Sequence, residues 1–251
     1  MRVAGPGIFR GMPTDPPADA QARLEAALPA ALERIRETSG VLGALWCGSA
    51  ARGEANAHSD LDFHVLVEGD RRWRANYVVD GVPVEVFHNP VRKVRAMFAA
   101  GQGDTIAMFA EGRIVLPHPE LDALTAEARA LHAAGPAPRP LTGQERFRLI
   151  EEVMDARALA DAGDPLHVLV ACRAAEQALE GLFGVRGWWE VKPQRWLPAL
   201  QERDPDAAHD LRTLLTTPDA HTRQAALEAL AVRVTGDLTY QEGGSEPVSV
   251  P

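Results

Sequence analysis

The stretch from Gly48 to Val67 constrains the fold of this chain more than any other. An apolar run ends in Gly48-Ser49, and after ten further residues a second apolar run begins at Asp60-Leu61-Asp62. The residues from Asp60 to Val67 fall on two alternating faces, as in a β-strand. Both aspartates share one face, roughly 6.5 to 7 Å apart at the backbone. The chain therefore places two carboxylates side by side on a strand.

Two neighbouring carboxylates repel each other unless one takes a proton or a cation lies between them. Mg²⁺ fits this position, because it prefers hard oxygen ligands and is usually held by a few carboxylates together with substrate phosphates. The Gly48-Ser49 turn adds backbone N–H groups and a hydroxyl, which are groups that contact phosphate. The pattern predicts half of a phosphoryl-transfer site. The alternative for an Asp-x-Asp pair is an exposed edge strand.

These residues resemble the polymerase-β-like nucleotidyltransferases, whose signature is an apolar strand, Gly-Ser, a gap of roughly ten residues, and Asp-x-Asp in a second strand. Gly48-Ser-Ala-Ala-Arg52-Gly53 followed by Ser59-Asp-Leu-Asp62 is most similar to the small bacterial branch of aminoglycoside and minimal nucleotidyltransferases. The resemblance implies that Asp60 and Asp62 are metal ligands. It implies nucleotide contacts from the turn and its flanks, at Gly48, Ser49, Arg52 and Ser59.

A third acid follows in a predicted hairpin. Asp80-Gly81 lies between two runs of β-forming residues, and Asp-Gly is the strongest short hairpin signal. Glu85 is the lone acid of the second run, where it is either an exposed edge residue or a paired one. In the resembled family, a third acid in such a strand completes the metal site. Glu85 matches that position in residue type and spacing.

The predicted fold class is an α/β (α+β) N-terminal domain with a mixed sheet, followed by an all-α helical bundle. The N-terminal domain covers residues 1–135, with an irregular lead-in over 1–17, and 136–141 form a Pro-rich linker. The bundle covers 142–238 and opens on a capping box at Thr142, and 239–251 form a loose tail. Within the first domain we expect helices over 18–37, 91–100, 104–110 and 120–132, and strands over 41–46 and 113–116.

Two bundle residues are further candidates. In the aminoglycoside branch a catalytic glutamate stands four residues after the first of a Glu-Glu pair, and Asp155 takes that place here. Asp155 or Glu85 would accept the proton of the acceptor hydroxyl, and the alternative for Asp155 is a solvated helix face. Lys192 is one of only two lysines beside 24 arginines. The branch uses a bundle lysine to reach the triphosphate, and the alternative is an ordinary surface lysine.

The resemblance implies a Mg²⁺-dependent enzyme, with one or two ions, that moves a nucleoside monophosphate, AMP from ATP in the first instance, to a hydroxyl of a small molecule. An aminoglycoside-like antibiotic is the leading acceptor class. One alternative is a toxin–antitoxin-type nucleotidyltransferase acting on a protein or RNA, for which Arg203 and His209 show the spacing of HEPN ribonucleases. Another is an inactive nucleotide-binding module.

Charge and composition limit the partners. The formal net charge of −9 argues against broad affinity for nucleic acid and suits a small cationic acceptor. The sequence contains no run of eighteen apolar residues, so we expect no membrane segment and a cytoplasmic location. Cys47 and Cys172 lie far apart in sequence, which favours reduced thiols over a disulfide.

Overall fold

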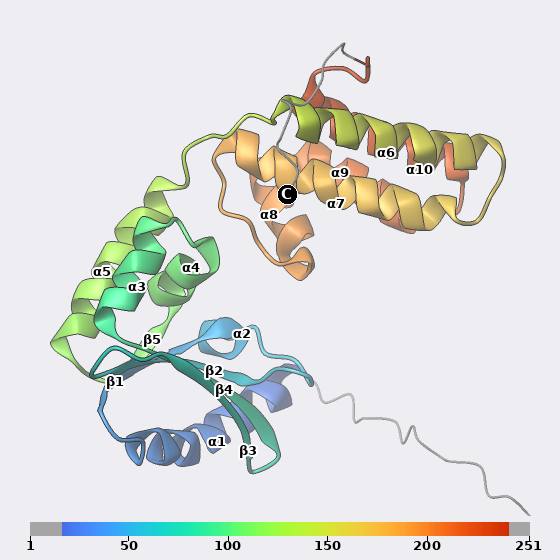
Figure 1. Ribbon diagram of the computed structural model, residues 1–251. Helices are drawn as coiled ribbons and strands as arrows, with labels where there is room; N and C mark the ends of the chain where they lie inside the picture. The colour runs from blue at the N-terminus through green and yellow to red at the C-terminus, as the bar shows by residue number, and fades with distance from the viewer. Residues whose placement is uncertain (1–16, 241–251) are drawn as a thin grey trace, which may run out of the picture. The chain divides into compact units, whose positions relative to one another are not determined.

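The computed structural model describes residues 17–240 and divides the chain into two compact units, Met1–Ala134 and Gly135–Pro251. The described part of the first unit combines helices with a mixed sheet, and that of the second is helical (Figure 1). The predicted fold class is confirmed. The lead-in expected over 1–17 and the tail expected over 239–251 lie almost wholly outside the described residues.

The described strands form one five-stranded sheet in the order β3-β4-β2-β1-β5. Strands β2 and β4 are parallel, and the other neighbouring pairs are antiparallel. Strands β1 and β2 lie inside the sheet and are largely buried, as their apolar sequences predict. The strand bounds are β1 Val41–Cys47, β2 Leu61–Val67, β3 Trp73–Val79, β4 Val82–Asn89 and β5 Arg113–Leu116.

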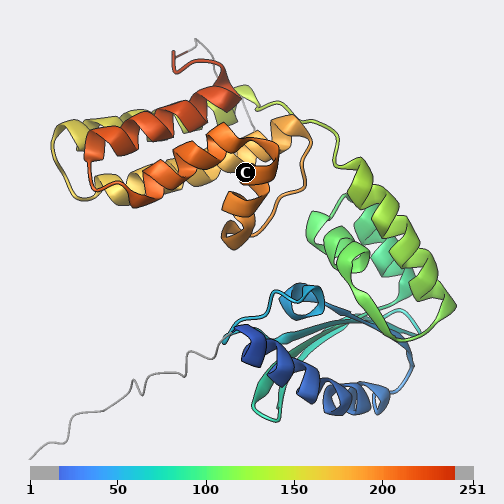
Figure 2. The same ribbon diagram turned by 180° about the vertical axis from the view of Figure 1, so that it is seen from behind.

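Helices cover both faces of this sheet (Figures 1 and 2). One face packs on α1 through a core that includes Leu24, Ile35, Phe63 and Val84. The opposite face meets α4 and α5, and it is there that Gly43 of β1 approaches Leu121 too closely for a side chain. The helices of this unit are α1 Pro17–Arg36, α2 Gly48–Arg52, α3 Val91–Ala99, α4 Gly103–Glu111 and α5 Pro119–Ala134.

The predicted hairpin is confirmed. Strands β3 and β4 are joined by Asp80 and Gly81, which both have positive φ, at 49° and 77°. Two such residues form the primed turn whose twist matches antiparallel strands. The turn pairs Val79 with Val82, and counting back along the ladder pairs Asn76 with Glu85.

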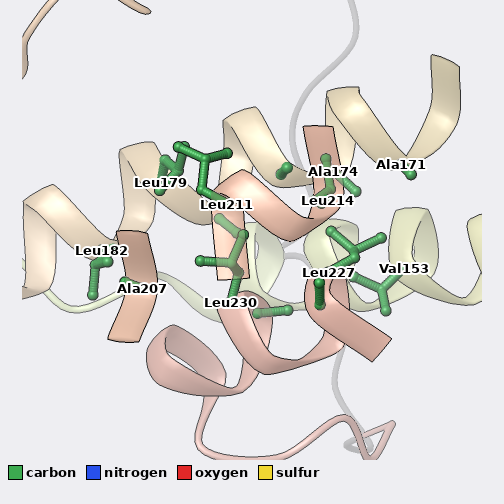
Figure 3. Packing of buried hydrophobic residues seen from close by; sticks show 14 of the residues in the cluster. Val153, Ala171, Ala174, Leu179, Leu182, Ala207, Leu211, Leu214, Leu227 and Leu230 are labelled. Carbon is green, nitrogen blue, oxygen red and sulfur yellow. The ribbon is translucent and has the colours of Figure 1, made fainter. Parts of the chain in front are cut away.

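The described helices of the second unit pack around one core, built mainly of leucine and alanine (Figure 3). Helix α10 packs against α6, α7 and α9. The core includes Leu149, Val153, Leu179, Leu182, Leu211, Leu214, Leu227 and Leu230. The helix bounds are α6 Gly143–Asp161, α7 His167–Arg186, the 3₁₀ helix η1 Pro193–Arg195, α8 Trp196–Arg203, α9 Pro205–Thr216 and α10 Ala220–Thr235.

The caps of these helices agree with their sequence. The predicted capping box is confirmed, because the Thr142 hydroxyl accepts from the Glu145 N–H and the Glu145 carboxylate accepts from the Thr142 N–H. Asp204 caps α9 and Asp219 caps α10. None of the described helices combines the length and the apolar character needed to cross a membrane.

Candidate active site

Strand pairing brings the predicted acids to one end of the sheet. Asp60 directly precedes β2, Asp62 is its second residue, and the parallel register pairs Asp62 with Glu85 of β4. The apolar neighbours of Asp62 and Glu85 on both strands pack on α1, so Asp62 and Glu85 face the other side of the sheet. All three are partly buried. Asp60 and Glu85 also line an open concavity of ≈ 380 Å³.

Gly48 lies directly against Asp62. Its φ is +80°, and a Cβ at this position would overlap the Asp62 carboxylate. Only glycine therefore allows the turn and the acid to approach this closely. The expected Gly-Ser turn is the first turn of the five-residue helix α2, which was not predicted. Before it, Cys47 donates its thiol hydrogen to the Asp62 carbonyl, with Sγ 3.4 Å from the oxygen, and burial together with the Asp62 charge raises the Cys47 pKa.

Ser49 and Ser59, both predicted nucleotide contacts, lie within hydrogen-bonding distance of each other, with their hydroxyls 3.2 Å apart. The Ser59 hydroxyl also accepts from the Asn56 N–H at 2.9 Å, and the Ser59 N–H donates to the Asn56 carbonyl at 3.0 Å. The loop that leads into Asp60 is thus joined to the start of α2. Helix α1 supports the same region, because Gln21 donates to the Ala50 carbonyl at 3.0 Å.

Arg52, the predicted phosphate contact on α2, is held by two carboxylates. Its guanidinium lies 2.8 Å from Glu54 and 3.1 Å from Glu111 at the end of α4. This ion-pair network ties α2 to α4. A phosphate contact from Arg52 stays a prediction, and it would require the guanidinium to leave or share these partners.

Arg74 of β3 is a charged neighbour that sequence reasoning missed. Its guanidinium forms an ion pair with Glu85 and lies 4.8 Å from the centroid of the Phe87 ring. The signal was present in the hairpin, because a two-residue turn at Asp80-Gly81 fixes which residues of β3 face Glu85. The register places Arg74 opposite Phe87, one diagonal step from Glu85.

His64 continues the acid-bearing face of β2 into the core. Its ring is buried, stacks on Phe87 at 5.1 Å and meets the edge of Phe109 at 5.0 Å. Burial lowers the pKa of His64 to about 4, so the ring is neutral at pH 7. His58 is exposed in the loop before β2, and His88 is buried against Trp73 with ring centroids 4.3 Å apart.

The carboxylates are chemically suited to a hard divalent cation. As the side chains stand, residues 17–240 contain no group of three or more His, Cys, Asp or Glu side chains placed to hold a metal ion. Glu85 is engaged by Arg74. The assignment of Asp60, Asp62 and Glu85 as metal ligands stays a prediction.

The two bundle candidates lie in the second unit. Asp155 is exposed on α6, and Lys192 is exposed directly before η1. Their catalytic and phosphate-binding roles stay predictions. In the segment with HEPN-like spacing, the Arg203 guanidinium lies 5.5 Å from the centroid of the Trp188 ring, and His209 is exposed on α9.

The comparisons with known proteins assign no role to any residue of this chain, so the site assignment depends on the chain's own residues. No family model matches the sequence, and no curated protein matches it significantly. Among solved structures, the chain is similar to the crystal structure of a nucleotidyltransferase-like protein from Exiguobacterium sibiricum 255-15. The two share 14% identity, the match covers 84% of this chain and 77% of that chain, and the TM-score is 0.44. At this level of similarity we transfer no residue role from that protein.

Proposed function

We propose that this protein is a nucleotidyltransferase whose active site lies at the end of β2 and β4. The proposal depends on one observation above all, the in-register pairing of Asp62 with Glu85 beside Gly48, with Asp60 two residues earlier. Three carboxylates at one strand end, next to a turn that only glycine fits, are suited to binding cations and phosphates together.

In this proposal Asp60, Asp62 and Glu85 would hold one or two Mg²⁺ ions, which when bound would supply positive charge against the phosphates of the nucleotide. Gly48 and Ser49 would contact the triphosphate through backbone N–H groups and the serine hydroxyl. Ser59 would keep the loop before Asp60 joined to Ser49, as its hydroxyl does in the structure.

The reaction is transfer of a nucleoside monophosphate to a hydroxyl. The acceptor oxygen bonds to the α-phosphorus, the bond between that phosphorus and the bridging oxygen breaks, and pyrophosphate leaves. The hydroxyl proton passes to a carboxylate, for which Glu85 and Asp155 are the candidates. Lys192 and Arg52 are the candidate cations for the triphosphate. ATP is the proposed donor.

The proposed acceptor is a small hydroxyl-bearing molecule, with an aminoglycoside-like compound as the leading class. The formal net charge of −9 favours a cationic acceptor over a nucleic acid. Antibiotic resistance would follow only if such a compound is modified.

Binding and turnover test the proposal in sequence. Calorimetric titration with each of the four nucleoside triphosphates and Mg²⁺ is expected to show binding of at least one, with ATP tightest. Incubation with that nucleotide and a panel of acceptors including aminoglycosides should release pyrophosphate and increase the acceptor mass by one nucleoside monophosphate. If no nucleoside triphosphate binds, the proposal is wrong. Binding with no turnover on any acceptor would favour an inactive nucleotide-binding module.

A further inference from the structure

We propose that Arg74 is a displaceable counter-ion of Glu85, which competes with the divalent cation for the Glu85 carboxylate. This inference rests on the proposed function, because it takes Glu85 as a metal ligand. Arg74 would then set how tightly the free protein binds a cation, and opening of the ion pair would accompany cation binding.

Local strand pairing fixes the position of Arg74. The turn at Asp80 and Gly81 places Asn76 opposite Glu85 and Arg74 opposite Phe87. Residues two apart share a strand face, so Arg74 and Glu85 are diagonal neighbours on the same face of the sheet. The ion pair follows from this geometry. The contact lies within one hairpin of the first unit, so it needs nothing from the helical unit.

The two partners differ in exposure, which makes Arg74 the one that moves. The Glu85 side chain is 20% exposed, whereas that of Arg74 is 58% exposed. A half-buried carboxylate gains from any cation beside it, because the surrounding protein screens charge less than water does. An exposed guanidinium loses little on returning to water, and pairs of this kind contribute little net free energy. A divalent cation can therefore displace it.

The ring of Phe87 gives the guanidinium a second contact. The Arg74 guanidinium lies 4.8 Å from the ring centroid, within the range of a cation–π interaction. Phe87 itself is fixed by stacking on the buried His64. Arg74 can thus release Glu85 and keep part of its packing, which lowers the cost of opening the pair. The closed pair reduces the apparent cation affinity in proportion to its population.

Mn²⁺ titration of the full-length chain without nucleotide tests this competition, with free Mn²⁺ followed by electron paramagnetic resonance. Arg74→Gln is expected to lower the Mn²⁺ Kd by about two- to fivefold, the range that an exposed ion pair can contribute. Glu85→Gln should raise the Kd. In the Glu85→Gln background, Arg74→Gln should have no further effect, because the carboxylate that both cations seek is gone.

Arg72→Gln is the matched control. Arg72 is an exposed arginine two residues before Arg74, and its loss changes the net charge by the same amount. It should leave the Kd unchanged. Arg74→Lys keeps the charge without the planar guanidinium and should fall between wild type and Arg74→Gln. Circular dichroism melting of each variant checks that the fold is retained.

The outcomes separate this inference from the proposed function. If wild type binds Mn²⁺ through Glu85 and Arg74→Gln leaves the Kd unchanged, the inference is overturned and the proposed function stands. The inference is also overturned if Arg72→Gln lowers the Mn²⁺ Kd as much as Arg74→Gln does. It is overturned as well if Arg74→Gln still lowers the Kd in the Glu85→Gln background, since either result reflects general electrostatics. Absence of Mn²⁺ binding in wild type overturns this inference, whereas the proposed function is tested separately by titration with the nucleoside triphosphates and Mg²⁺.

Discussion

At the scale of single residues, Gly48 is the described glycine at which a Cβ would come closest to another atom. A side chain there would combine a strained backbone with overlap of the Asp62 carboxylate. We predict that Gly48→Ala lowers pyrophosphate release at least about tenfold and destabilises the fold by roughly 1–3 kcal/mol. Activity assays and urea denaturation measure the two effects.

Gly53 is the control for this prediction, because its φ of +78° is nearly the same and no atom lies within 4 Å of the position of a Cβ. Gly53→Ala should cost the backbone strain alone, roughly 1 kcal/mol, with activity nearly unchanged. If the two variants lose activity equally, the close approach of Gly48 to Asp62 has no functional meaning.

The burial of His64 predicts how the free energy of unfolding depends on pH. Burial lowers its pKa from 6.5 to about 4, so between these values the unfolded chain binds a proton that the folded chain excludes. The contribution of neutral His64 is complete above pH 6.5 and is lost as the pH falls toward 4, by at most about 3 kcal/mol. In urea denaturation across this range, His64→Phe should flatten the pH dependence of the free energy of unfolding.

His58→Gln serves as the comparison, because His58 is exposed and its removal should leave the pH dependence as in wild type. A wild-type slope retained in His64→Phe would mean that other groups cause the acid sensitivity.

The residue-scale predictions from sequence succeeded where local pattern was enough. The hairpin turn placed Glu85 in a strand, which the register then pairs with Asp62. That Asp60 shares a face with Asp62 stays a prediction, because β2 begins at Leu61. The contact of Arg74 with Glu85 was missed, although the same turn fixes it. Burial of His64 between Phe87 and Phe109 depends on α4, which is distant in sequence, and no local pattern indicates it.

At the scale of elements, long periodic segments and turn chemistry were predictable. Strand β5 has the predicted bounds, and the capping box at Thr142 stands where expected. Helix α2 was not predicted, because five residues are too short to show helical periodicity. Helix α10 begins at Ala220, where the Asp219 side chain accepts a hydrogen bond from the Thr222 N–H.

Helix α9 allows a prediction about the bundle core. Leu214 is 1% exposed and packs in the cluster of Figure 3, whereas Leu215, the next residue, is 54% exposed. We expect Leu214→Ala to destabilise the helical unit by about 2–5 kcal/mol, because it removes buried methyl groups and leaves a cavity. Leu215→Ala should change stability by less than about 0.5 kcal/mol.

Hydrogen exchange of peptides from α6 to α10 measures this difference. Faster exchange in Leu214→Ala and unchanged exchange in Leu215→Ala are the predicted results. Equal effects of the two substitutions would contradict the packing of α9.

At the scale of the whole molecule, each unit has a core of its own. The change from strands to helices beyond the proline-rich segment was visible in the sequence, because composition and periodicity change together there. The acceptor could not be predicted, because the shape of a binding pocket depends on side chains from many elements. The metal ligands proposed in the first unit can be tested without knowing the acceptor.

The most direct test of the central claim compares substitutions of two acids, one in β2 and one just beyond the end of that strand. The rate of pyrophosphate release is measured with an acceptor that the wild-type protein modifies. Asp62→Asn removes the proposed metal ligand, and Glu68→Gln removes an exposed carboxylate just beyond the opposite end of the strand. We predict that Asp62→Asn lowers kcat at least about a hundredfold and that Glu68→Gln stays within about twofold of wild type. Pyrophosphate release by Asp62→Asn at the wild-type rate would contradict the account.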